Sequence, residues 1–449
     1  MVMVLLAAGC RAPRQVDSMP FVSQEFAAGE DFATRQVGYE LPVIPPIPPQ
    51  LPQLNNSTPL KLAEAEQIAL QKNPSLAVRQ SQLDVSEGRW EQAGLYPNPI
   101  IGYHATEVGN LDTSGVQGLF VRQRVITGGK RRLDQQVADS GIDLAEFQMA
   151  ITRQRVITEV RLRFFDLLVA RRRVELTTKL AELTNQLAGT TKKLLDGNIV
   201  SDNDLLQAEI EAEQAQILRD NAQQATREFE RRLSAVIGIR LPPDHPIQGQ
   251  LSQDSPQLTW KTSLQGTLSG SPELQAAAVR VERARRAIER ANQQPIPDID
   301  FLLSLRHNNI TGHDVANIQV GIPVPVFDRN QGNIRAAIGE MAAAQNDERR
   351  IQLRLEQRLA VAFRRYQNAL HQVRRYKKFI LPKAEQSMTL VRKAYSGGQA
   401  NYLMLITSQR TFIRASLSHL DSLRALREAG TMIEGRLLTD SLDEPGRGR

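Results

Sequence analysis

The chain is poor in cysteine and in aromatic side chains. Cys10 is the only cysteine among 449 residues, and Phe, Trp and Tyr together make up 5%. A single cysteine excludes an intrachain disulfide and a cysteine-based metal site. No apolar run approaches the roughly 18–20 residues that a membrane-spanning helix needs. The sequence therefore excludes a disulfide scaffold and an ordinary helical membrane protein, but not a protein that crosses a membrane by strands, whose signals are weaker.

Catalytic and cofactor motifs are also missing. There is no HExxH, no EF-hand loop and no GxGxxG, and Gly129-Lys130 lacks the other residues of a phosphate loop. The six histidines are dispersed. His307 and His313 share one predicted hairpin loop, where either metal binding or simple solvent exposure is open, and we favour exposure. We predict a protein that is not an enzyme and has no cofactor or metal site.

The balance of charge is positive, with a formal net charge of +7 and a pI of about 9.6. Such a charge is typical of proteins that bind nucleic acid or an anionic membrane. It is also typical of proteins whose solvated helix faces are rich in Lys and Arg. The arginines are scattered and few aromatics lie among them. We therefore favour solvated helix faces and predict no nucleic-acid partner.

The N-terminus resembles a bacterial lipoprotein signal. Leu6-Ala7-Ala8-Gly9-Cys10 ends a short apolar run, but no Lys or Arg precedes it, as the start of a signal peptide requires. We interpret residues 1–10 as such a signal, incomplete if translation starts upstream, and predict lipidation of Cys10; the alternative is a chance cysteine. Residues 11–59 are polar and then proline-rich, which predicts an extended tether.

The rest of the chain repeats with an offset of about 198 residues. Residues 73–76 resemble 271–274, and Pro97-Asn98-Pro99 resembles Pro295-Ile296-Pro297 at the same offset. Gly197 corresponds to Gly398, each just ahead of a Leu/Ile pair. Internal repeats outweigh local signals in predicting a fold. The domains predicted are a first repeat (60–238), a connector (239–270), a second repeat (271–435) and a polar tail (436–449).

Each repeat contains the same predicted elements. Each repeat starts with a helix (60–94 or 271–293), which is followed by two strands. The second strand of each repeat (116–126 or 315–325) alternates in hydrophobicity. A long helical rod follows (131–195 or 330–396, interrupted by Pro382), and a return helix ends the repeat (202–238 or 401–435). At 1.5 Å per residue, some 65 residues form a rod of about 100 Å. Asp196-Gly197-Asn198 supplies a left-handed cap at the end of the first rod, Ser201 and Asp204 form a capping box, and Asn401 caps the last helix.

Four short alternating strands cannot form a buried sandwich, and their open edges have to be paired. Strands cross a bilayer only as closed barrels, and the smallest have eight strands. The predicted fold is therefore mainly α with a small β part: long coiled-coil hairpins that form an α-helical barrel, plus four transmembrane strands per chain. Three chains then complete a trimeric 12-stranded β-barrel.

This repeated pattern over residues 60–435 resembles the TolC-like outer membrane efflux proteins. Within that family, Pro323-Val324-Pro325-Val326-Phe327-Asp328-Arg329-Asn330-Gln331-Gly332-Asn333-Ile334 is similar to a segment of the CzcC-like branch, which is associated with heavy-metal efflux. Thr127-Gly128-Gly129-Lys130-Arg131 occupies the equivalent place in the first repeat.

The resemblance implies a homotrimeric outer membrane exit duct of a tripartite efflux system, passive and gated at its periplasmic tip. It implies a helical tunnel in the periplasm, a membrane-fusion adaptor, an inner membrane RND pump as partner, and export of heavy-metal cations. The tip residues that it implies as contacts of the adaptor are Gly197, Val200, Ser201, Leu205, Leu206, Gly398, Asn401, Tyr402, Leu405 and Ile406. Residues 387–391 lack the acidic side chains that some relatives place there, so an acidic selectivity ring is not expected. The alternatives are a channel for drugs or type I secretion, and a soluble basic coiled-coil interaction protein.

Overall fold

A computed structural model describes residues 58–109, 114–251, 258–397 and 399–442. The chain divides into two units, residues 1–49 and 50–449, and every described residue belongs to the second unit. Within the described residues, no helix combines the length and the hydrophobicity needed to span a membrane.

The helices of the second unit account for most of its residues. They are α1 (Leu62–Lys72), α2 (Pro74–Gly94), α3 (Lys130–Asp196), α4 (Asp202–Ile237), α5 (Trp260–Gly270), α6 (Pro272–Gln293), α7 (Gln331–Arg375), the π-helical segment η2 (Tyr376–Ile380), α8 (Leu381–Ser396) and α9 (Tyr402–Glu434). α3 spans 67 residues without a break, which corresponds to about 100 Å at 1.5 Å per residue. The long rod predicted for the first repeat is therefore present.

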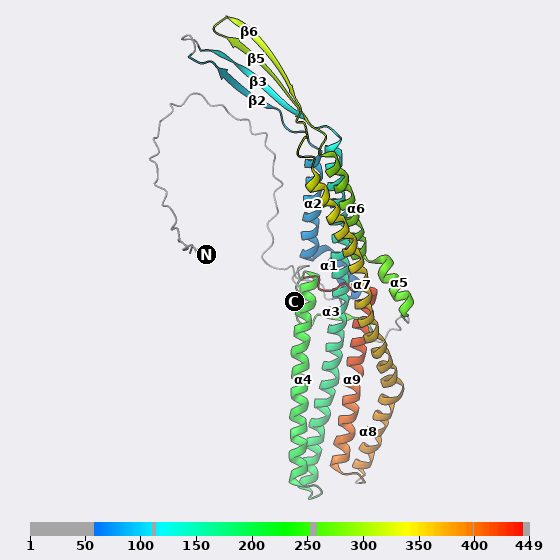
Figure 1. Ribbon diagram of the computed structural model, residues 1–449. Helices are drawn as coiled ribbons and strands as arrows, with labels where there is room; N and C mark the ends of the chain where they lie inside the picture. The colour runs from blue at the N-terminus through cyan, green and yellow to red at the C-terminus, as the bar shows by residue number, and fades with distance from the viewer. Residues whose placement is uncertain (1–57, 110–113, 252–257, 398, 443–449) are drawn as a thin grey trace, which may run out of the picture. The chain divides into compact units, whose positions relative to one another are not determined.

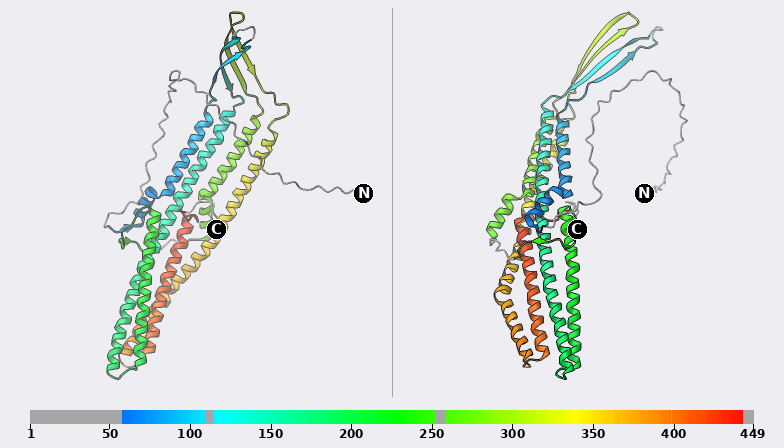
Figure 2. Two further views of the ribbon diagram at one scale, coloured as in Figure 1. Left: turned by 90° about the vertical axis from the view of Figure 1, so that its left-hand side faces the viewer. Right: turned by 180° about the vertical axis from the view of Figure 1, so that it is seen from behind.

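The strands form two sheets. β2 (Ile100–Thr106), β3 (Val116–Val125), β5 (Ile299–Asn308) and β6 (His313–Gly321) make an antiparallel sheet in the order β2-β3-β5-β6. β1 (Leu60–Lys61) and β4 (Ile247–Gln248) form a short parallel pair. In the second unit, the four-stranded sheet lies at one end, and the α3–α4 and α8–α9 turns lie at the other (Figure 1; Figure 2).

Each helical hairpin has its own hydrophobic core. In the first, Val160 and Phe164 of α3 pack on Leu233 and Ile237 of α4, and all four are completely buried. A second cluster joins residues of α7 and α9 with Leu437, which lies just beyond α9: Leu359, Ala362, Tyr366, Ala429, Ile433 and Leu437. The apolar residues recur at steps of three and four, so one stripe of each long helix faces its antiparallel neighbour.

The halves of the chain contact each other both in the sheet and between the helices. The β3–β5 ladder pairs Val125 with Ile299 and continues to Val116 and Asn308. Farther along, Nε of Arg424 on α9 lies 2.7 Å from a carboxylate oxygen of Asp166 on α3. These contacts bring equivalent elements of the two halves side by side.

Several expected boundaries differ from the structure. The first helix is broken at Asn73, because a residue before proline disfavours the helical conformation. The Asn73 side chain instead accepts a hydrogen bond from the Ser75 N–H and caps α2. β6 ends at Gly321 rather than 325, ahead of Pro323 and Pro325, which cannot donate to a ladder.

The connector and the second rod also differ from their predicted structures. Residues 239–270 were expected to be a connector, but they include β4 and the helix α5. After α5, Ser271 caps α6, which starts at Pro272; in the same way Asn73 follows α1 and caps α2. The second rod passes through η2 immediately before Pro382. The Leu381 N–H bonds to the Tyr376 carbonyl five residues back. This wider turn accommodates the proline, which lacks an N–H, in the middle of a rod.

Candidate functional site: an amphipathic sheet and two helix turns

One face of the four-stranded sheet is apolar and exposed. The register aligns Ile101, Val121, Leu303 and Ile318 across all four strands. Their exposed fractions are 71%, 41%, 37% and 69%. The same face carries Tyr103, Leu119, Phe301, Leu305 and Val320, which are also exposed. A contiguous apolar patch of this kind marks a surface that contacts protein or lipid.

The opposite face of the sheet is largely polar. It carries Arg122, Arg124 and Arg306 together with Asp300, because side chains alternate between the faces of a strand. Nε of Arg124 lies 3.0 Å from a carboxylate oxygen of Asp300. The sheet is therefore amphipathic across its whole width.

The two outer strands of this sheet each pair with a single neighbouring strand. β2 pairs only with β3, and β6 only with β5, among the residues that the structure describes. Each edge thus presents backbone groups without a ladder partner.

The first helix turn, between α3 and α4, is fixed by local hydrogen bonds. The left-handed cap expected within Asp196-Gly197-Asn198 is present at Asn198, which has φ 58°, whereas Gly197 has φ −86°. The capping box is confirmed: the Asp204 N–H donates to Ser201 Oγ, and the Ser201 N–H donates to the Asp204 carboxylate at 3.0 Å. Gly197 and Ser201 are exposed, as is Leu206 at 58%, whereas Val200 and Leu205 are half-buried.

The second turn, between α8 and α9, is capped by Asn401. Its side-chain carbonyl accepts a hydrogen bond from the Met404 N–H at 2.9 Å, as expected. Gly398 lies outside the described residues. Tyr402, Leu405 and Ile406 are only 5%, 2% and 5% exposed. They lie inside the second unit rather than at its surface.

This burial follows from contact between the two hairpins near their turns. Tyr402 and Ile406 pack on Ala208 of α4, with Leu187 and Tyr395 at the margin of the cluster. Burial, with smaller effects from Tyr395 and Asp204, raises the pKa of Tyr402 to about 12. Its hydroxyl has no hydrogen-bond partner among the described residues.

Three strongly exposed apolar residues of the turns were not among the predicted tip residues. Ile199, Leu403 and Met404 have exposed fractions of 72%, 64% and 53%. Each is adjacent to a predicted tip residue. The three- and four-residue spacing of apolar residues did not indicate which of them are exposed. Which of them face the neighbouring hairpin depends on how the hairpins pack.

The histidines of the sheet do not form a metal centre. His307 Nδ1 lies 2.8 Å from the Asp314 carboxylate, and His313 is exposed at the start of β6. Within the described residues, no group of three or more His, Cys, Asp or Glu side chains is placed to hold a metal ion. Cys10 lies outside the described residues.

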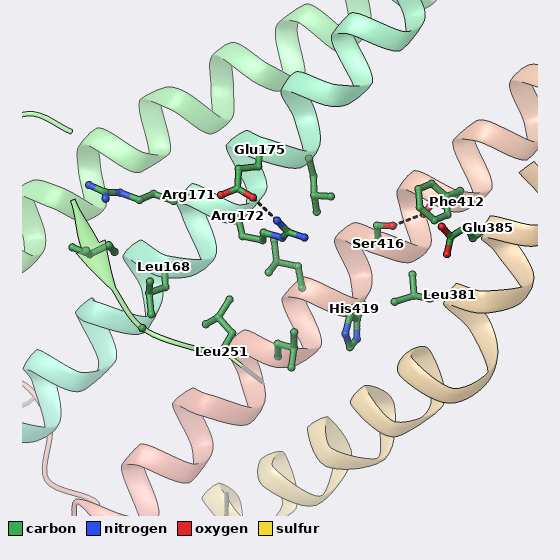
Figure 3. Close-up of a pocket in the computed structure, with 15 residues that line it drawn as sticks. Leu168, Arg171, Arg172, Glu175, Leu251, Leu381, Glu385, Phe412, Ser416 and His419 are labelled. Atoms are coloured by element: carbon green, nitrogen blue, oxygen red, sulfur yellow. Dashed lines mark hydrogen bonds and ion pairs between the residues drawn. The ribbon is translucent and has the colours of Figure 1, made fainter. Parts of the chain in front are cut away.

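A cavity of about 640 Å³ lies among α3, α8 and α9 (Figure 3). His419 from α9 lines it, and burial, followed by the positive charge of Lys377, lowers the pKa of that imidazole. Arg171 and Arg172 line it as well, but they already form ion pairs with Glu230 and Glu175. The cavity therefore offers no cluster of groups that identifies a ligand.

Comparison with known proteins identifies this architecture. Residues 264–433 match the family described as outer membrane efflux protein. The cobalt-zinc-cadmium resistance protein CzcC of Cupriavidus metallidurans is 27% identical over 380 residues, which are 84% of this chain and 89% of that protein. The chain is therefore similar to outer membrane efflux proteins, through the family match over residues 264–433 and through a relative that aligns with most of its length.

Two solved structures share the fold of this chain. CusC superposes with a TM-score of 0.72 at 16% identity and covers 90% of this chain and 99% of its own. The outer membrane protein VceC from Vibrio cholerae has a TM-score of 0.68 at 19% identity and covers 84% and 96%. The predicted resemblance to TolC-like efflux proteins and to the CzcC-like branch is confirmed. Together, the family match and the CzcC relative support an efflux channel of the outer membrane rather than an enzyme.

Proposed function

We propose that this protein is the homotrimeric exit duct of a tripartite system that exports heavy-metal cations. It works with a periplasmic adaptor and an inner membrane RND pump. The amphipathic sheet with two open edges carries this proposal. In lipid, unpaired strand edges are too costly to persist, so they have to be closed by further strands. Four strands from each of three chains give twelve, above the minimum of eight for a membrane barrel.

The contact between the halves of one chain is a template for the contact between chains. The segment after β3 docks on the start of β5: Thr127 Oγ1 donates to the Pro297 carbonyl, and Lys130 Nζ lies 2.6 Å from the Asp298 carboxylate. Among the described residues, the equivalent segment after β6 makes no such contact with the start of a strand, and Phe327 is 91% exposed. We expect Phe327 to lie near residues 95–98 of the next chain, ahead of β2.

A trimer is testable in detergent. The mass of the purified protein, corrected for bound detergent, is expected to be three times that of the 50.1 kDa chain. Recovery of a monomer from the soluble fraction without detergent would instead support a soluble coiled-coil protein. The exposed Ile210 and Ile217 on α4, each more than half exposed, support helix contacts between chains.

Metal cargo is supported by the relative that is named for cobalt, zinc and cadmium resistance. A strain without this gene is expected to lose tolerance to divalent metals and to regain it on complementation. Unchanged metal tolerance with greater drug sensitivity would move the cargo to drugs. A secretion defect alone would indicate type I secretion.

The two turns are proposed as the adaptor-contacting tip in the periplasm. Exposed residues such as Ser201 and Leu206 provide the contact, and the packed Leu405 and Ile406 hold the turns in place. A photoreactive amino acid at Leu206 is expected to cross-link to the adaptor, whereas one at the buried Leu405 is not. Equal cross-linking from both positions would contradict this division.

The N-terminal assignments remain proposals. Cys10 is lipidated and anchors the chain in the outer membrane, and residues 11–59 are the tether. Mass spectrometry of the mature protein tests the anchor, since an unmodified Cys10 would contradict it. The limits of the repeats are proposals as well, with the second starting at α5 rather than at 271, since α5 and α6 repeat the arrangement of α1 and α2.

A further inference from the structure

The charges of the sheet are concentrated on its polar face. Of the residues in β2, β3 and β5, three arginines (Arg122, Arg124 and Arg306) and one carboxylate (Asp300) occupy this face. Because Arg124 is paired with Asp300 at 3.0 Å, these two charges cancel. Arg122 and Arg306 form no ion pair with any residue that the structure describes. Two uncompensated positive charges per chain remain.

Neighbouring residues hold both arginines along this face. Gly118 lies opposite Arg306, and a Cβ added there would come within 2.7 Å of Arg306 Cγ. The absence of a side chain at Gly118 therefore lets the arginine stem lie flat across β3. Gly102 leaves room for the Phe120 ring in the same way, and Arg122 lies over that ring with 5.9 Å between its Cζ and the ring centroid.

The apolar face has no counterpart to these arginines. Asp314 and its partner His307 lie near the end of that face, beyond Leu305. If the apolar face contacts lipid, then Arg122 and Arg306 face the conducting path, since successive side chains of a strand point to opposite faces.

We propose that Arg122 and Arg306 form an anion-selecting belt in the strand-lined part of the channel. This inference rests on the proposed channel but not on its cargo. Three chains contribute six uncompensated positive charges, which attract small inorganic anions such as chloride and repel cations. The repulsion energy is twice as large for a divalent cation as for a monovalent one, and it acts on cations that move in either direction. Salt screens the effect, since the Debye length is only about 8 Å at physiological ionic strength.

The test is a reversal-potential measurement with the full-length protein in a planar lipid bilayer across a potassium chloride gradient. The wild-type channel is expected to be more permeable to chloride than to potassium. In the R122Q/R306Q variant, the chloride-to-potassium permeability ratio is expected to fall on the order of twofold. The charge-conserving R122K/R306K variant is expected to keep the wild-type ratio.

The paired charges on the same face provide a matched control. R124Q/D300N removes one positive and one negative charge per chain, so its permeability ratio is expected to stay close to wild type. An unchanged ratio in R122Q/R306Q, or a wild-type channel that prefers potassium, would overturn the belt while leaving the channel intact. Correctly folded trimers that give no conductance would overturn the proposed channel and the belt together.

Discussion

A lysine placed on the apolar face of the sheet is expected to prevent membrane assembly, and the adjacent position provides its control. Ile318 lies in the middle of β6 on the apolar face and is 69% exposed in the single chain. Gln319 is the next residue of the same strand, is also exposed, and points to the polar face. The two substitutions therefore add the same charge to the same strand at nearly the same depth.

The expected cost differs sharply between the two positions. A lysine that faces lipid near the centre of a membrane strand costs about 2–4 kcal/mol, whereas a residue that faces the lumen is solvated. Three chains multiply the penalty of Ile318→Lys to about 6–12 kcal/mol per trimer. That amount is comparable to the whole stability of a typical domain. Gln319→Lys is expected to assemble as the wild type does.

Outer membrane fractions from density gradients, followed by separation of unheated trimers, measure the outcome. Ile318→Lys is expected to leave little trimer in the membrane fraction, and Gln319→Lys is expected to leave the wild-type amount. Equal assembly of both variants would refute the assignment of the apolar face to lipid. Failure of both would show that β6 tolerates no lysine on either face, which also contradicts the reasoning.

Three further predictions concern the helices. Ser201→Ala removes the capping box and is expected to destabilise the start of α4 by about 1 kcal/mol, seen as faster amide hydrogen exchange there; Ser201→Thr is the control. Leu233→Ala leaves a cavity at a completely buried site and is expected to lower the free energy of unfolding by about 2–5 kcal/mol, measured by thermal unfolding. Leu218 is partly exposed, so Leu218→Ala is the control and is expected to have little effect. Because the pKa of Tyr402 is raised to about 12, its contribution to stability is complete below pH 10 and is lost between about pH 10 and 12, as ionisation favours the unfolded chain. Tyr402→Phe is expected to remove the highest step from a spectrophotometric tyrosine titration, and an unchanged titration would contradict the raised pKa.

Much of the fold was predictable because it rests on local patterns. Apolar residues recur at steps of three and four along α3, and no proline interrupts them. The pattern therefore predicts one long helix. The alternation at Ile318 and Val320 likewise predicted a strand with one apolar face. Capping by Ser201 and Asn401 depends on residues only three positions apart, and both caps are present.

Other features depend on contacts that are remote in the sequence. The sequence marked Tyr402, Leu405 and Ile406 as tip residues, but their burial against the first hairpin requires the packing of α3 and α4 on α9. The π-helical turn at η2 was missed because Pro382 indicates only that a helix is disturbed. Whether the chain breaks, kinks or widens by one residue depends on the surrounding packing.

The amino-acid sequence by itself therefore determined the duplicated architecture, the long rods, the amphipathic strands and the kinship to outer membrane efflux proteins. Periodicity, caps and prolines act within a few residues and are read directly from the chain. Only the tertiary structure decided the strand order β2-β3-β5-β6, and with it the alignment that places Arg122, Arg124, Asp300 and Arg306 on one face. The pairing of β3 with β5 joins residues almost two hundred positions apart, and no local pattern specifies that register.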